Sequence, residues 1–229
     1  MFTKFILKIN NIVKSNKHIF FILLALIVCM AIYSVNVSKG LEENIIRLHI
    51  VANSNSSEDQ ALKLAVRDAV IEYMQAKLSN SKSIDESKQI INMNISNIKE
   101  LVDEKIKAHG KNYPVKVELG RFPFPTKSYG EFVLPAGNYQ ALRVSIGNAE
   151  GSNWWCVLFP PLCFVDVTHS TVPDSVKDEL KEILTEEEYS IITSSENDDD
   201  IPVKVKFKIV EFFQNSRIKF SGLISKIFK

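Results

Sequence analysis

The sequence predicts an α+β protein with one exported domain behind an N-terminal membrane segment. Three observations indicate this class. Residues 19–37 are almost entirely apolar, residues 57–110 repeat their apolar positions with a period near 3.6, and residues 111–164 change to alternation with a period of two. This succession favours a two-layer domain, in which a mostly antiparallel sheet packs against a helical hairpin.

The 229-residue chain divides into segments of different composition. Without the first 40 residues it is still long enough for one domain with a real hydrophobic core. The expected segments are a basic cytoplasmic leader (1–18), a transmembrane anchor or signal segment (19–37), an exported α+β domain (41–172), an acidic helix and linker (173–200), and a basic strand or amphipathic tail (201–229).

The N-terminal apolar run predicts the location of the domain. Ile19 to Val35 contains no charged residue, and about 20 apolar residues cross a bilayer as a helix. Lysines without any acidic residue precede the run and hold that end in the cytoplasm: Lys4, Lys8, Lys14 and Lys17. We therefore expect an uncleaved single-pass anchor with the rest of the chain translocated. A cleaved signal peptide, or a lipoprotein on Cys29, is the alternative.

Composition argues against several classes of function. The formal net charge is +1, and the leader lysines contribute +4, so the remainder of the chain sums to −3. Nucleic-acid binding usually needs a basic excess, which is missing. The sequence also has no H-E-x-x-H, no C-x-x-C and no glycine-rich phosphate loop. We expect no cofactor, no metal, no nucleic acid and no small-molecule substrate.

Local patterns place the elements of the exported domain. Ile46, Leu48 and Ile50 alternate with Arg47 and His49, which is typical of a half-buried strand with one solvated face. A polar turn then leads into an amphipathic helix ending near residue 78. A capping box, Ser83-x-x-Glu86, opens a second helix that ends before Gly110. Three or four strands linked by hairpins follow between residues 115 and 159.

The segment Asn153 to Phe164 is the densest aromatic run outside the N-terminal segment. Adjacent side chains of a strand point to opposite faces, so Trp154 and Trp155 cannot both enter one core layer. One interpretation is a buried central strand that stops at the prolines. The other is a partner-binding surface built on one of the two tryptophans.

Cys156 and Cys163 flank the turn at Pro160, where a chain reversal allows a disulfide or two buried thiols. The alternative is a catalytic cysteine, with His49 or His169 as the base, but no sequence motif around the cysteines supports it.

Further binding candidates lie on the first helix and in the tail. Arg67 and Asp68 suit either a polar contact or a partner surface, as do Arg47 and His49 on the strand. The tail combines apolar residues at roughly helical spacing with basic residues that suit an anionic membrane surface: Lys204, Lys206, Lys208, Arg217, Lys219, Lys226 and Lys229. Its alternative is one more strand, from Val203 to Phe207, docked on the domain.

Four segments resemble the stage II sporulation protein R family, in the same order and over roughly residues 41–170. They are Ile46 to Val70, Pro114 to Gly130, Leu134 to Val144 and Asn153 to Asp166. The resemblance implies an intercompartmental signalling protein of sporulation and not an enzyme. Such a protein is made in the forespore and activates, by binding, a membrane-embedded aspartic protease of the mother cell that processes pro-sigma-E.

This resemblance implies a location in the forespore membrane, single-pass with the N-terminus inside, or in the intermembrane space after secretion. It carries over no catalytic residues. The alternatives are an exported cysteine-dependent hydrolase and a non-enzymatic envelope scaffold.

Overall fold

The computed structural model describes residues 17–164 and 172–193. The described residues fall into two units that divide after Val37. Helix α2 (Lys17–Asn44) carries the apolar run. In the part of the chain that the structure describes, no helix combines the length and apolar character that a bilayer crossing requires. The membrane segment at residues 19–37 therefore stays a prediction.

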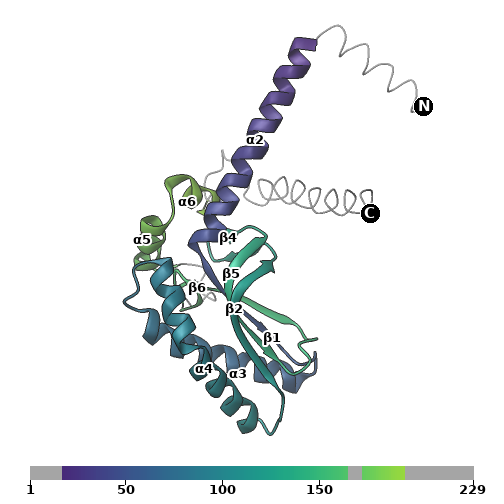
Figure 1. Ribbon diagram of the computed structural model, residues 1–229, viewed down its shortest axis with the longest axis vertical. Coiled ribbons are helices and arrows are strands. Elements are labelled where there is room, and N and C mark those ends of the chain that lie inside the picture. Colours follow the sequence, from purple (N-terminus) through teal and green to yellow (C-terminus); the bar gives the residue numbers. More distant parts are fainter. Residues whose placement is uncertain (1–16, 165–171, 194–229) are drawn as a thin grey trace, which may run out of the picture. The chain divides into compact units, whose positions relative to one another are not determined.

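The second unit is an α+β domain built on a four-stranded sheet (Figure 1). Helices α3 and α4 lie side by side along one face of this sheet. Its elements after α2 are β1 (Ile46–Val51), α3 (Ser57–Leu78), α4 (Ile84–Ala108), β2 (Val115–Phe124), β3 (Lys127–Tyr129), β4 (Phe132–Leu134), β5 (Gly137–Ile146), β6 (Asn153–Phe159), the 3-10 turn η1 (Leu162–Phe164), α5 (Asp174–Ile183) and α6 (Glu186–Thr193).

Side-chain caps fix the ends of the helical hairpin. The Ser56 hydroxyl accepts a hydrogen bond from the backbone N–H of Asp59, and Ser83 accepts one from Glu86 in the same way. Both bonds satisfy a backbone donor that the first helical turn leaves free. After α4 the chain turns at Gly110, whose φ of +68° suits a residue without a side chain. The predicted hairpin is confirmed.

The sheet is mixed, with the strand order β2-β5-β1-β6. Strand β1 runs parallel to β5 and antiparallel to β6, whereas β2 and β5 are antiparallel. The prediction that consecutive strands join by hairpins is wrong for β5 and β6, because β1 lies between them. Strands β3 and β4 form a separate two-stranded hairpin.

The polar turn after β1 is hydrogen-bonded both to the start of α3 and to the connection between β5 and β6. Asp59 accepts hydrogen bonds from Asn53 (2.8 Å) and Ser54 (2.6 Å), and these bonds hold the pKa of its carboxyl below the usual value. The Asn53 side-chain oxygen in turn accepts from the backbone of Asn148, between β5 and β6. The turn therefore fixes the β5–β6 connection relative to the start of α3.

The two faces of the sheet bury separate cores. The helix-side core joins α3 and α4 to alternate residues of β1, β5 and β6, including Leu48, Val144 and Leu158. The opposite core packs the other side chains of the sheet against the β3–β4 hairpin, α5 and α6. Strand β1 is buried along its whole length. The expectation of a solvated Arg47 and His49 face is therefore wrong, because elements later in the sequence cover that face.

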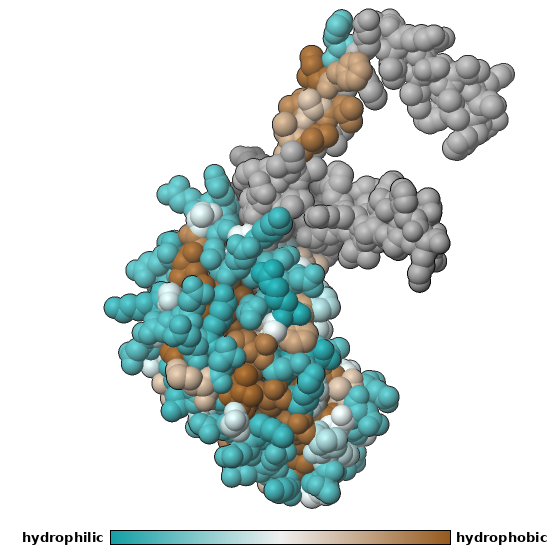
Figure 2. Space-filling model, viewed as in Figure 1, coloured by the Kyte–Doolittle hydropathy of each residue, from teal (hydrophilic) through white to brown (hydrophobic). Residues whose placement is uncertain are grey.

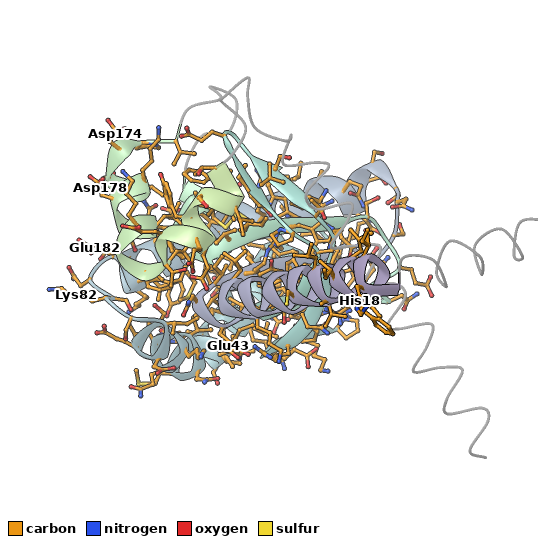
Figure 3. The ribbon with its side chains drawn as sticks, turned by 90° about the horizontal axis from the view of Figure 1, so that it is seen from above. His18, Glu43, Lys82, Asp174, Asp178 and Glu182 are labelled. Carbon is orange, nitrogen blue, oxygen red and sulfur yellow. A yellow bond between two sulfur atoms is a disulfide. The ribbon has the colours of Figure 1, made fainter. Side chains whose placement is uncertain are left out.

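The surface of the domain is mainly hydrophilic in the view of Figure 2. The acidic segment after Pro173 forms α5 and α6, as its composition indicates. Figure 3 shows Asp174, Asp178 and Glu182 along the outer side of α5. The buried side of the same helix inserts Leu180 into the opposite core.

Candidate partner-binding face

A row of side chains crosses all four strands on the face opposite α3 and α4. In the strand register, Glu118 of β2 lies opposite Arg143 of β5, Arg143 lies opposite His49 of β1, and His49 lies opposite Trp155 of β6. We call these four residues the cross-strand row. Neighbouring strands lie about 4.8 Å apart, so the four side chains are close neighbours.

Arg47 lies on the same face of β1, two residues before His49, and is fully buried. Its guanidinium is 4.4 Å from the ring centre of Phe124, 4.9 Å from that of Tyr139 and 5.6 Å from that of Tyr129. One nitrogen donates to the Tyr129 hydroxyl at 2.5 Å, and another donates to the carbonyl of Cys156 at 3.5 Å. Aromatic faces attract a cation, so this cage stabilises the arginine without a carboxylate.

Small neighbours make room for the Arg47 cage. The cross-strand partner of Arg47 on β5 is Ala141, and the partner of Ala141 on β2 is Gly120. Burial raises the pKa of the two tyrosines that contact the guanidinium, Tyr129 and Tyr139. Their hydroxyls therefore stay protonated, and the positive charge of Arg47 is not neutralised by a phenolate.

His49 is neutral and held in one orientation. Its ring stacks on Trp155 with 3.8 Å between the ring centres and 16° between the planes. Nε2 lies 2.7 Å from the side-chain oxygen of Asn153, which places the proton of the neutral ring on Nε2. Burial, with a smaller contribution from Arg143, lowers the pKa of His49 to about 4. Nδ1 has no hydrogen-bond partner among the residues that the structure describes.

Arg143 is half-buried beside His49, with its guanidinium 5.2 Å from the ring centre of Phe122. Its Nε lacks a hydrogen-bond partner within the described ranges. The acidic member of the cross-strand row, Glu118, forms an ion pair with Lys116 at 2.8 Å. Arg143 is thus a second cation on this face whose charge the neighbouring acid does not balance.

The two tryptophans face opposite sides of the sheet, as their adjacency predicts. Trp154 packs against the helix-side core, and the guanidinium of Arg67 lies 4.3 Å from its ring centre. Arg67 also pairs with Asp68 at 2.6 Å. The structure therefore brings Arg47, His49 and Trp155 together and separates them from the other candidates, Arg67, Asp68 and Trp154.

Cys156 and Cys163 form a disulfide, with 5.6 Å between their Cα atoms. The 3-10 turn η1 returns the chain so that Cys163 reaches the strand. Cys156 belongs to the helix-side core, whereas His49 lies on the other face of the sheet. The structure does not bring a free thiol to His49. His169, the other candidate base, and the basic tail residues lie outside the described residues.

Two observations on the described residues concern metal ions and small ligands. They contain no group of three or more His, Cys, Asp or Glu side chains that could hold a metal ion. A cavity of about 150 Å³ lies beside β6, where Leu78, Leu158 and Glu179 are among its lining residues. Sites for drug-sized ligands usually enclose 300–1,000 Å³, so this cavity is small for one.

Sequence reasoning missed Arg143 and the aromatic residues Phe122, Phe124, Tyr129 and Tyr139. Arg143 alternates with Leu142 and Val144, so its place on a polar strand face was visible. Its position opposite His49 was not visible, because that pairing joins strands far apart in the chain.

These features define an α+β domain in which one sheet face lies under a helical hairpin. The other face carries Arg47 buried among aromatic side chains and Arg143 half-buried beside His49. Residues 42–169 match the family described as stage II sporulation protein R. The chain is also 35% identical over 185 residues to stage II sporulation protein R of Bacillus subtilis strain 168, which covers 76% of this chain and 82% of that protein. The chain therefore belongs to the stage II sporulation protein R family and has a sporulation signalling role. No solved structure matches it.

Proposed function

We propose that the protein is an exported signal that activates a membrane-embedded aspartic protease of the mother cell by binding it. The activated protease then processes pro-sigma-E. The observation that carries the proposal is the family match over residues 42–169, which spans the sheet and the helical hairpin. In this role the protein is a ligand and not an enzyme.

The proposed location is the forespore membrane, single-pass with the N-terminus inside, or the intermembrane space after secretion. The lysine leader and the uncharged run Ile19 to Val35 support it. Large apolar side chains are exposed along α2, as the brown surface in Figure 2 illustrates; Phe21, for example, is 62% exposed. The Cys156–Cys163 disulfide is a further support, since such bonds persist mainly in oxidising compartments.

Reconstitution in a non-sporulating bacterium tests the function. Cells would produce the full chain, the protease and pro-sigma-E together, and immunoblotting would follow removal of the pro-sequence. We expect processing only when all three proteins are present. A folded and exported chain that leaves pro-sigma-E intact in the presence of an active protease would contradict the proposal, and so would full processing without the chain.

The same assay tests the surface. Trp155 is half-buried and stacks on His49, so Trp155→Ala removes an aromatic anchor from the cross-strand row. Truncation of an interface anchor typically costs about 2 kcal/mol, roughly thirtyfold in affinity. We expect processing to fall sharply while circular dichroism shows a folded domain.

Trp154→Ala is the matched comparison, because Trp154 is also half-buried but packs toward the helices. Processing that is lost with Trp154→Ala and kept with Trp155→Ala would move the interface to the helix face that carries Arg67 and Asp68.

A further inference from the structure

The face that carries the cross-strand row holds positive charge that its own acidic residue does not neutralise. Arg47 is fully buried in its aromatic cage, and Arg143 is half-buried next to it. Glu118 is already paired with Lys116. The aromatic cage stabilises Arg47, whereas Arg143 has no carboxylate partner among the described residues and is half-exposed, so its charge is open to a negative group of a partner.

Buried atoms without a hydrogen-bond partner lie on the same face of the sheet, on β1 and β5. Nη1 of Arg47, Nδ1 of His49 and Nε of Arg143 are buried, and none has a hydrogen-bond partner among the described residues. Buried polar atoms without a partner are rare in proteins, and three of them on adjacent strands require an explanation. Two of these atoms are donors, whereas Nδ1 of the neutral His49 ring is an acceptor.

This combination fits a peptide better than a simple anion. A carboxylate satisfies the arginine donors, but it offers nothing to an acceptor nitrogen. A peptide with an acidic side chain supplies both a carboxylate and backbone N–H groups. Trp155 adds a half-exposed aromatic surface, which suits the apolar part of such a chain.

We propose that the cross-strand row binds an extended acidic segment of a partner protein. Arg143 binds a carboxylate of that segment, and Trp155 packs against its chain. The side chains that cover Nδ1 of His49 shift on binding, so that this atom accepts one of the segment's backbone N–H groups. Arg47 lies beneath the site and adds to the positive potential. The proposal deepens the proposed function and rests on it for the identity of the partner, since it states the chemistry by which the protease or an associated protein is recognised.

Peptide binding to the full chain tests the site. The probe is a short, capped, fluorescent peptide with glutamate at alternate positions, and fluorescence anisotropy measures its affinity. Its counterpart with glutamine at the same positions shows whether the carboxylates are needed. We expect the glutamate peptide to bind at least tenfold more tightly, because hydrogen bonds to charged groups are the stronger ones.

Substitutions locate the binding. Arg143→Gln should weaken the glutamate peptide about tenfold, whereas Arg143→Lys keeps the charge and should weaken it less. Lys99→Gln is the charge-matched control on the exposed side of α4 and should leave the affinity unchanged. Equal affinity of the wild type and folded Arg143→Gln would overturn the proposal. Equal binding of the glutamate and glutamine peptides would do the same.

Other ligands of this face would give different results in the same experiments. Binding to anionic phosphatidylglycerol vesicles that Arg143→Gln weakens, without binding of the peptide, would assign the charge of this face to a lipid surface. Peptide binding that appears only after deletion of residues 194–229 would indicate that the chain's own acidic linker fills the site. Either result would overturn the assignment to a partner protein.

The peptide experiment tests the binding site, and the processing experiment tests the proposed function, so a negative result in one does not decide the other. Intact processing by a chain that does not bind the peptide would remove the acidic-segment site and leave the proposed function standing. Specific peptide binding without any processing would remove the proposed function and leave the site.

Discussion

At the residue scale, Arg47 has a different role from the one that its sequence pattern indicates. Alternation with Ile46 and Leu48 predicted a solvated side chain, but the side chain is fully buried. Arginine keeps its charge in proteins, so the aromatic cage has to stabilise a permanent cation. Arg47→Ala would therefore act mainly through the packing of Phe124, Tyr129 and Tyr139, and not as a rim charge that tunes the association rate.

His49 makes the stability of the domain depend on pH. Its pKa is about 4 in the folded protein and 6.5 as the reference value, so the unfolded chain binds more protons between these values. Stability is therefore complete above about pH 6.5 and is lost as the pH falls toward 4, by on the order of 3 kcal/mol. We expect chemical denaturation to show this decrease in the free energy of unfolding.

A variant without the His49 imidazole isolates the effect. His49→Phe keeps a ring to stack on Trp155 but cannot be protonated, so the decrease between pH 6.5 and 4 should become smaller. Met93→Gln is the control at an exposed position without a titratable group and should keep the wild-type pH dependence. An unchanged pH dependence in His49→Phe would mean that other groups cause the acid destabilisation.

At the scale of elements, local patterns predicted what local interactions determine. The spacing of apolar residues and the serine caps located α3 and α4. Alternation located β1, β2 and β5, and a continuous apolar run located β6. The place of β1 between β5 and β6 depends on pairing between distant segments, and no local pattern encodes that order. For the same reason the sequence identified His49 and Trp155 but not Arg143 as their neighbour.

The disulfide joins strand β6 to the turn η1 and closes a short loop. The loop spans 7 residues, for which the chain-entropy relation gives about 2 kcal/mol of stabilisation. The double variant Cys156→Ala, Cys163→Ala should lower the free energy of unfolding by about this amount and still support processing of pro-sigma-E. Cys29→Ala, at an exposed free cysteine, should change neither quantity. Loss of processing by a folded double variant would favour thiol chemistry.

At the scale of the whole molecule, the charge of the leader predicts the topology. A reporter that is active only in the cytoplasm, fused after Lys229, should be silent if the domain is translocated. Replacing Lys4, Lys8, Lys14 and Lys17 with glutamate removes the inside signal and should raise reporter activity. High activity of the unchanged fusion would show that the C-terminal end stays in the cytoplasm.

The basic tail provides a separate test with membranes. Attraction to an anionic surface is about 1 kcal/mol per lysine or arginine and is screened by salt. The fragment 41–229 should sediment with anionic vesicles at low salt and be released at high salt. A variant with Lys204, Lys206 and Lys208 changed to glutamine should bind more weakly. Equal binding to neutral vesicles would leave the docked-strand interpretation of the tail.

The central position of β1 also sets the order in which the domain can be completed. Ile46 pairs with Gln140 on one side and with Phe159 on the other. A growing chain therefore carries β1 without a partner until β5 has been made, and with one free edge until β6, the last strand of the sheet, has followed. Contacts between such distant segments slow folding. For a chain with the proposed topology, we expect the four-stranded sheet to be completed only after β6 has crossed the membrane.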